Sequence, residues 1–142
     1  MSKIFWDTNL FIYLFEKHPK FSPPTIKLRK RMLERKDELI TSAMTLGEVQ
    51  IGPRRANQPD LASSYRDAME QTCTVVPFDK TAADIYANIR ENASIRPPDA
   101  IQLSCAAAAG VELFVTNDQS LTKLTIRGIH FVTSLDRLPF AL

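Results

Sequence analysis

The sequence predicts one α/β domain in which a mostly parallel sheet lies between two layers of helices. Short apolar runs alternate along the chain with longer segments of helical periodicity, the pattern of strands joined by helical crossovers. The 142 residues, 44% hydrophobic and 24% charged, suit a single domain with one core. No linker or internal repeat divides the chain, so we expect one domain over residues 1–142.

Five short runs are predicted as strands. Several are apolar at successive positions, as in "ELFV" at residues 112–115, which is typical of strands buried on both faces of a sheet. The predicted strands are Lys3–Asp7, Glu38–Ser42, Thr74–Phe78, Glu112–Thr116 and Ile129–Thr133. Their separation by helical segments predicts a three-layer sandwich around a mostly parallel five-stranded sheet.

Six helices are predicted between the strands. They are Asn9–Lys17, Thr25–Lys36, Ala43–Ile51, Asp60–Gln71, Lys80–Asn92 and Pro98–Ala109. Asp79 is suited to cap the helix that follows it, and Gly110 is suited to end the last helix. The segment "GPRRANQPD" after Glu48 contains helix breakers, and we expect it to shorten or bend the third helix.

Composition narrows the possible classes of protein. No apolar run approaches the roughly 18 residues that a membrane span requires, and the first residues do not have the pattern of a secretory signal. Cys73 and Cys105 have no metal-type spacing, and His18 and His130 lie in unrelated segments, so a histidine-rich or thiolate metal site is excluded. Reduced thiols predict an intracellular, cytoplasmic protein, and a net charge of +2 permits an acidic partner without requiring one.

Four acidic residues have informative positions relative to the predicted sheet. Asp7 ends the first strand, and Asp118 follows the fourth. Glu48 lies in the second turn of the helix after the second strand, and Asp99 in the first turn of the helix that leads to the fourth. Because crossover helices run antiparallel to the strands, all four map to the carboxyl edge of the sheet, where α/β folds bind their ligands.

Each acid also has a purely structural interpretation as a helix cap or a partner of a helix dipole. As a group, four carboxylates at close range repel one another, and a divalent cation would relieve that repulsion. Oxygen ligands without histidine or thiolate favour Mg²⁺ or Mn²⁺. Asp79 ends a strand at the same edge, but its capping role is complete without a metal, so we expect it outside the site.

With these motifs the chain resembles the PIN-domain nucleases, in particular the toxins of VapBC-type toxin–antitoxin pairs. The resemblance covers essentially the whole chain and rests on "DTN", "TSAMTLGEV", "RPPDAIQLSCAAAAG" and "FVTND", in this order. It implies the strand order 3-2-1-4-5 and endoribonuclease activity that depends on Mg²⁺ or Mn²⁺, with one or two ions per site. It also implies a small cognate antitoxin as partner and a homodimer.

The resemblance assigns roles by position. The matching catalytic and metal-binding acids, which would hold metal directly or through water, are Asp7, Glu48, Asp99 and Asp118. The matching polar supporting residues are Thr8, Asn9, Thr116 and Asn117, for which helix capping and turn formation are the alternatives. Among the acids, Glu48 is the best candidate to orient or deprotonate the attacking water, with metal ligation as its second possibility.

Basic residues suited to an RNA backbone follow two of the predicted elements. The segment "TIKLRKRMLERK" carries six basic residues against one acid, and further arginines lie after Glu48 and before Asp99. Those predicted to contact phosphates are Arg29, Arg31, Arg54, Arg55 and Arg96. A solvated helix face is the alternative for each of them. Such contacts would supply affinity without sequence information.

The aromatic segment "LFIYLFEKHPKF" contains more large rings than one helix face needs for a core. We expect Phe11, Phe15 and Phe21 to form an apolar patch for a partner protein. The leading hypothesis for the whole chain is a metal-dependent endoribonuclease toxin that hydrolyses RNA phosphodiester bonds. The alternative is a non-catalytic PIN-like RNA-binding module. A receiver-type phospho-acceptor domain is disfavoured, because Asp7 has no acidic neighbour.

Overall fold

The computed structural model describes all residues, 1–142, and its centre is a five-stranded parallel sheet. The strands are β1 (Lys3–Trp6), β2 (Glu38–Ser42), β3 (Thr74–Val76), β4 (Leu113–Val115) and β5 (Phe131–Thr133). Their order is β3-β2-β1-β4-β5, as the resemblance implied. In the central register, Phe5 of β1 pairs with Ile40 of β2 and Phe114 of β4.

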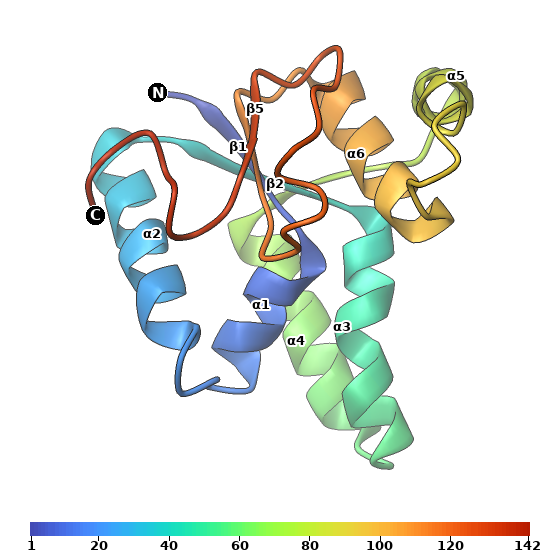
Figure 1. Cartoon of the computed structure of the whole chain (residues 1–142). Coiled ribbons are helices and arrows are strands. Elements are labelled where there is room, and N and C mark those ends of the chain that lie inside the picture. The colour runs from blue at the N-terminus through green and yellow to red at the C-terminus, as the bar shows by residue number, and fades with distance from the viewer.

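Helices cover both faces of this sheet (Figure 1). They are α1 (Thr8–Phe15), α2 (Ser22–Arg35), α3 (Ala43–Arg55), α4 (Pro59–Thr72), α5 (Lys80–Ile89) and α6 (Pro97–Ala109). Helices α3 and α4 pack against each other and project away from the sheet (Figure 1). None of the helices combines the length and hydropathy that crossing a bilayer would require.

The core has two parts because successive strand residues point to opposite faces. Ile4 and Trp6 of β1 pack with residues of α1, α2, α3 and α4. Phe5, between them in the sequence, packs with α5 and α6 on the other face and stacks on Phe114 at 4.9 Å between ring centroids. Both faces of the central strands are therefore buried, which is why apolar residues stand at successive positions in them, as in Ile4–Trp6 and Leu113–Val115.

The predicted elements are correct in type and order, but several bounds differ. The strands β1, β3, β4 and β5 are shorter than predicted by one or two residues. The expectation that the third helix ends near Ile51 was wrong, because α3 continues through Pro53 to Arg55. A proline removes one helical hydrogen bond, but Ala56 N still donates to Gly52 O (3.0 Å) and Gln58 N to Pro53 O (2.8 Å). The last turn therefore remains closed.

Two of the predicted helix boundaries form as expected. The Asp79 carboxylate accepts a hydrogen bond from Ala82 N (3.0 Å) and caps α5. Gly110 ends α6 in the left-handed conformation, with φ of +66°, where a residue without Cβ is favoured. Asp79 follows the edge strand β3 and does not line the acidic pocket described below.

Candidate active site

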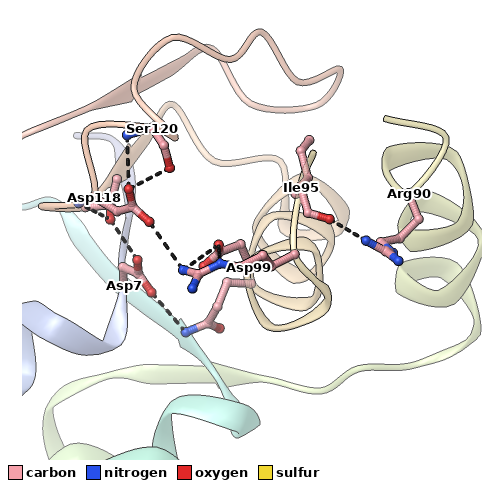
Figure 2. A network of polar contacts seen from close by, with 9 residues as sticks. Asp7, Arg90, Ile95, Asp99, Asp118 and Ser120 are labelled. Carbon is pink, nitrogen blue, oxygen red and sulfur yellow. Dashed lines mark hydrogen bonds and ion pairs between the residues drawn. The ribbon is translucent and has the colours of Figure 1, made fainter. Parts of the chain in front are cut away.

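A shallow acidic pocket of about 250 Å³ lies at the carboxyl edge of the sheet. All four predicted acids line it: Asp7 after β1, Glu48 of α3, Asp99 of α6 and Asp118 after β4. The pocket is possible because the parallel topology brings the ends of β1 and β4 and the starts of α3 and α6 to one edge. Figure 2 shows how close Asp7, Asp99 and Asp118 lie to one another.

Asp7 is the most constrained acid of the pocket. Its Oδ2 accepts a hydrogen bond from Thr116 Oγ1 (2.7 Å), and its Oδ1 accepts from Thr8 N (2.8 Å), so it also caps α1. Burial raises the pKa of this carboxyl despite these hydrogen bonds, and the negative charge of Asp99 raises it further. Asp7 is therefore a carboxylate whose ionised form a nearby cation would stabilise.

The position of Glu48 is fixed by a directed chain of hydrogen bonds. Thr8 Oγ1 donates its only proton to Glu48 Oε1 (2.6 Å), so Gln102 Nε2 donates to Thr8 Oγ1 (3.0 Å). Glu48 Oε2 makes no hydrogen bond within the protein. The chain therefore orients one carboxylate oxygen and leaves the other available to a water molecule or an ion.

Gln102 is the centre of the buried polar network beneath the acids, and sequence reasoning missed it. Its Nε2 lies within hydrogen-bond distance of Thr45 Oγ1 (2.7 Å), Thr8 Oγ1 (3.0 Å) and Asp7 Oδ1 (3.4 Å), and its two protons are shared among them. Its Oε1 accepts from Ser42 Oγ. One signal was present in the sequence. Gln102 follows Asp99 by three residues, which places both side chains on the same face of the helix, and it is the single strongly polar side chain in the rest of that helix.

Asp99 and Asp118 share one cation. The guanidinium of Arg96 lies 3.2 Å from Asp99 Oδ2 and 3.7 Å from Asp118 Oδ2. Asp118 Oδ1 accepts from Ser120 N (3.0 Å) and Ser120 Oγ (2.7 Å), which fixes the loop after β4. Arg90 holds the segment before Arg96 through the carbonyl oxygen of Ile95 (Figure 2). Arg96 is thus the only cation lining the pocket.

The other predicted supporting residues divide into two groups. Thr8 and Thr116 hold Glu48 and Asp7, as described above. Asn9 lines the pocket, and its Oδ1 is buried without a hydrogen-bond partner. Asn117 does not bind an acid, because its Nδ2 donates to the hydroxyl of Tyr13 (2.9 Å).

Of the five arginines predicted to contact RNA, only Arg96 lines the acidic pocket. Arg31 pairs with Glu34 of its own helix at 3.1 Å. Arg54 binds Gln50 Oε1, and Arg55 ends α3 about two helical turns beyond Glu48. Arg29 lies near Cys73, just before β3: burial raises the pKa of that thiol, and Arg29 is among the groups that oppose the rise.

The aromatic patch expected for a partner protein does not form as predicted. Phe11 is buried, with 4% of its surface exposed, because it lies on the face of α1 that packs against Trp6. Phe15 stacks on Tyr65 of α4 at 4.3 Å between ring centroids. Phe21 belongs to a separate aromatic cluster beside the site.

The chemistry of the donors fits a hard divalent cation. Four carboxylates line the pocket, and Asn9, which also lines it, has a buried Oδ1 without a hydrogen-bond partner. Hard cations prefer oxygen ligands. No three acidic, histidine or cysteine side chains lie close enough together to hold a metal ion by themselves. Mg²⁺ usually takes one or two carboxylates and keeps several water ligands, which suits carboxylates spread around a shallow pocket.

Comparison with solved structures identifies the same fold in several complexes. A chain of "VapBC2 from Rickettsia felis bound to a DNA fragment from their promoter" has a TM-score of 0.75 and 18% identity, covering 93% of this chain and 98% of that one. A chain of DNA-bound VapBC from Salmonella typhimurium has a TM-score of 0.73 and 23% identity, covering 95% of this chain and 99% of that one. A chain of VapBC-1 from nontypeable Haemophilus influenzae has a TM-score of 0.68 and 19% identity, covering 95% of this chain and 99% of that one. At these identities the similarity shows the fold.

Sequence comparison gives the family. No curated protein sequence matches the chain at a significant level. The family model described as "PIN domain" matches residues 4–126. This range begins in β1 and ends after the loop that carries Asp118, so it includes every acid of the pocket. PIN domains are generally nucleases. The resemblance noted in the sequence is thereby confirmed, and the chain belongs to the PIN domain family.

Proposed function

We propose that the protein is a metal-dependent endoribonuclease that hydrolyses RNA phosphodiester bonds. The observation that carries the proposal is the acidic pocket: four carboxylates, one of them buried with a raised pKa, face a single arginine. Membership of a nuclease family supports the same reaction class. A pocket with this surplus of negative charge favours binding of a divalent cation.

Three of the acids would hold the metal, directly or through water. Asp7, Asp99 and Asp118 approach the pocket from β1, α6 and the loop after β4. Mg²⁺ or Mn²⁺ bound there would lower the pKa of a water molecule and stabilise charge on the phosphoryl oxygens. Thr116 and Ser120 keep Asp7 and Asp118 in place before any ion binds, which reduces the reorganisation that binding requires.

Glu48 would orient or deprotonate the attacking water. Thr8 occupies one carboxylate oxygen of Glu48, and the other is free. A proton acceptor that is held in one orientation and has an unoccupied lone pair is suited to general-base catalysis. Arg96, 74% exposed at its side chain, would contact a phosphate of the substrate once a metal ion neutralises Asp99 and Asp118.

We further infer that the protein is the toxin of a type II toxin–antitoxin pair. Supporting this, the structurally similar chains come from complexes titled VapBC and from a "Toxin-antitoxin complex from Klebsiella pneumoniae". The inference includes a small antitoxin as partner, a homodimer and a cytoplasmic location. Coexpression with the product of a short adjacent reading frame, followed by copurification, tests the partnership.

Cleavage of RNA by the full chain tests the proposed reaction. We expect cleavage with Mg²⁺ or Mn²⁺ and none with EDTA. Asp7→Asn should reduce cleavage by about 1,000-fold or more, since the metal contributes several kcal/mol of transition-state stabilisation. Asp79→Asn is the matched control: it changes an acid at the same edge but outside the pocket, and asparagine retains the cap.

Two outcomes would contradict the proposal. Undiminished cleavage by the Asp7→Asn variant would remove the acidic pocket as the site of reaction. Metal-dependent RNA binding without cleavage, over a broad panel of RNAs, would instead identify the chain as a non-catalytic RNA-binding module.

A further inference from the structure

A second hollow, of about 520 Å³, lies beside the acidic pocket and has no role in the reaction described above. Asn117 and Gln119 line it. Asp118, between them in the sequence, lines the acidic pocket instead. The loop after β4 therefore separates the two hollows and contributes residues to both.

Phe21 lines this hollow and belongs to an aromatic cluster with Tyr13 and His18. The Phe21 ring centroid lies 4.9 Å from that of Tyr13 and 5.0 Å from that of His18, and Tyr13 and His18 are 5.3 Å apart. Of the three rings, that of Phe21 lines the hollow, and this residue is only partly buried. The other two rings fix the orientation of the Phe21 ring, so a base that displaces the Lys20 ammonium from over it would stack there at little entropic cost.

The cluster is attached rigidly to the site. Tyr13 accepts a hydrogen bond at its hydroxyl from Asn117 Nδ2 (2.9 Å). His18 Nδ1 accepts from Phe21 N (3.1 Å) and from Lys20 N (3.2 Å), which fixes the turn between α1 and α2. The ring of Phe21 thus contacts Tyr13, whose hydroxyl is hydrogen-bonded to the loop that carries Asp118.

The charged and polar groups of the hollow suit a nucleotide. The Lys20 Nζ lies over the Phe21 ring, 5.2 Å from its centroid. Its side chain is exposed and forms no ion pair, so it can move from the ring to a phosphate. Asn117 and Gln119 offer amide groups, and Asp136 offers a carboxylate, which can accept from the amino groups of bases. Aromatic stacking combined with a cation and amide groups is how proteins hold single-stranded nucleic acid.

A third hollow, larger than these two, differs from them in its lining. It measures about 620 Å³ and lies between α5, α6 and residues 124–128, where Ile85, Ile89, Ile95 and Ile126 line it. It shares no residue with the acidic pocket. Neither its chemistry nor its position indicates a nucleic acid.

We propose that the hollow beside Asp118 is a nucleoside-binding subsite for single-stranded RNA. The base next to the scissile phosphate stacks on Phe21, its edge meets the amides of Asn117 and Gln119, and Lys20 neutralises the adjoining phosphate. This inference rests on the proposed ribonuclease function and assigns Phe21 to the substrate rather than to a partner protein. Stacking on an aromatic ring contributes about 1–3 kcal/mol per base, measured by alanine substitution.

Binding of labelled single-stranded RNA, measured by fluorescence anisotropy in the Asp7→Asn background, tests the subsite without cleavage. Phe21→Ala should weaken binding about 5- to 100-fold, the range that 1–3 kcal/mol of stacking represents. Phe21→Leu keeps apolar volume and should be similarly weak, whereas Phe21→Trp should restore binding. Lys20→Gln should lower the slope of log K against log salt by about one.

Phe131→Ala is the matched control. Phe131 is 65% exposed and opens β5 at the amino edge of the sheet, far in the topology from the acids, so its removal should leave RNA affinity unchanged. Circular dichroism would establish that the Phe21 variants remain folded.

The outcomes separate the subsite from the proposed function. Equal RNA affinity for Phe21→Leu and the Asp7→Asn parent would overturn the subsite, while RNA cleavage by the chain with Asp7 intact would leave the ribonuclease function standing. Weakened binding of a partner protein, with RNA affinity unchanged, would also overturn it. No RNA binding by the Asp7→Asn parent, together with no cleavage by the unmodified chain, would overturn both.

Discussion

The acids at the two edges of the sheet differ in how well the folded chain neutralises their charge. At the amino edge, Asp37 is fully buried at its side chain and accepts from Arg35 Nε (2.8 Å) and Ser2 N (2.8 Å). Glu112 accepts from Lys3 N (2.6 Å) at the same edge. These acids have partners close by and line none of the three hollows described above.

At the carboxyl edge, four carboxylates surround one pocket and Arg96 is the only cation that lines it. The buried Asp7 has hydroxyl and amide donors but no cation as partner. Burial alone therefore does not distinguish a structural acid from a functional one. The distinction is whether the folded chain supplies enough positive charge for the carboxylate, since an uncompensated buried charge destabilises the fold and persists at sites of function.

The largest effect on stability is expected at the amino edge. Asp37→Ala removes hydrogen bonds to a charged acceptor and leaves Arg35 without its partner. We expect the free energy of unfolding to fall by about 2–3 kcal/mol, measured by urea denaturation. RNA cleavage per folded molecule should be unchanged. A loss of cleavage without a loss of stability would contradict the comparison of the two edges.

At the carboxyl edge, the largest effect outside the acids is expected at Gln102. Gln102→Met keeps the length of the side chain but removes the donor that orients Thr8, and through it Glu48. Residues that orient a catalytic group typically contribute about 10- to 100-fold, so kcat should fall by this factor with little change in KM. Gln71→Met, at an exposed position of α4 outside the acidic pocket, is the control.

To interpret the Gln102 variant, a loss of activity from a misplaced Glu48 must be distinguished from a loss of activity through unfolding. Thermal melting should show that the variant is folded at the assay temperature, because its packing volume is nearly conserved. If kcat is unchanged in a folded variant, Glu48 does not need this network to act, and the network is structural.

The sequence was sufficient for the fold and for the location of the acids, because both follow from alternation and from the ends of strands. The order β3-β2-β1-β4-β5 came from the resemblance rather than from periodicity. The polar network beneath the acids could not be predicted, because the contacts of Gln102 with Ser42 and Thr45 depend on side-chain rotamers across α3, β2 and α6.

The pairing of charges could not be predicted from the sequence either. The sequence lists 18 basic residues but does not show which of them meet acids. Arg29 and Arg31 both belong to the basic segment at residues 25–36, yet Arg31 pairs with Glu34 and Arg29 lies near Cys73. Only tertiary structure separates these from Arg96.

A smaller effect is expected on metal affinity. Arg96→Gln removes the cation that competes with a metal ion for Asp99 and Asp118. Because the arginine is largely exposed, the two ion pairs are weak, and the affinity for Mn²⁺ should rise only about two- to fivefold. Isothermal titration calorimetry of the metal alone measures this. Unchanged or weaker affinity would mean that Arg96 does not oppose the metal.

The pH dependence of stability also tests the comparison between the acids of the two edges. Burial raises the pKa of Asp7 in the folded chain above its ordinary value of 3.8, so the folded state binds a proton more readily than the unfolded state. The slope of the unfolding free energy with pH is proportional to the number of protons bound by the unfolded state minus the number bound by the folded state. Because the folded state binds more protons here, stability falls as pH rises from 3.8 through the raised pKa of Asp7. Below 3.8 the group is protonated in both states and this contribution disappears.

Asp7→Asn should therefore stabilise the metal-free protein while abolishing cleavage. The gain in unfolding free energy over the unmodified chain should be largest at neutral pH and should shrink toward about pH 4, near the ordinary pKa of an aspartate. Urea denaturation in EDTA at both pH values measures it. A loss of stability at neutral pH would show that the hydrogen bonds from Thr116 and Thr8 N outweigh burial, and Asp7 would then resemble Asp37. A gain in stability would show that the Asp7 carboxylate destabilises the metal-free fold, as expected of a residue whose function is to bind a cation.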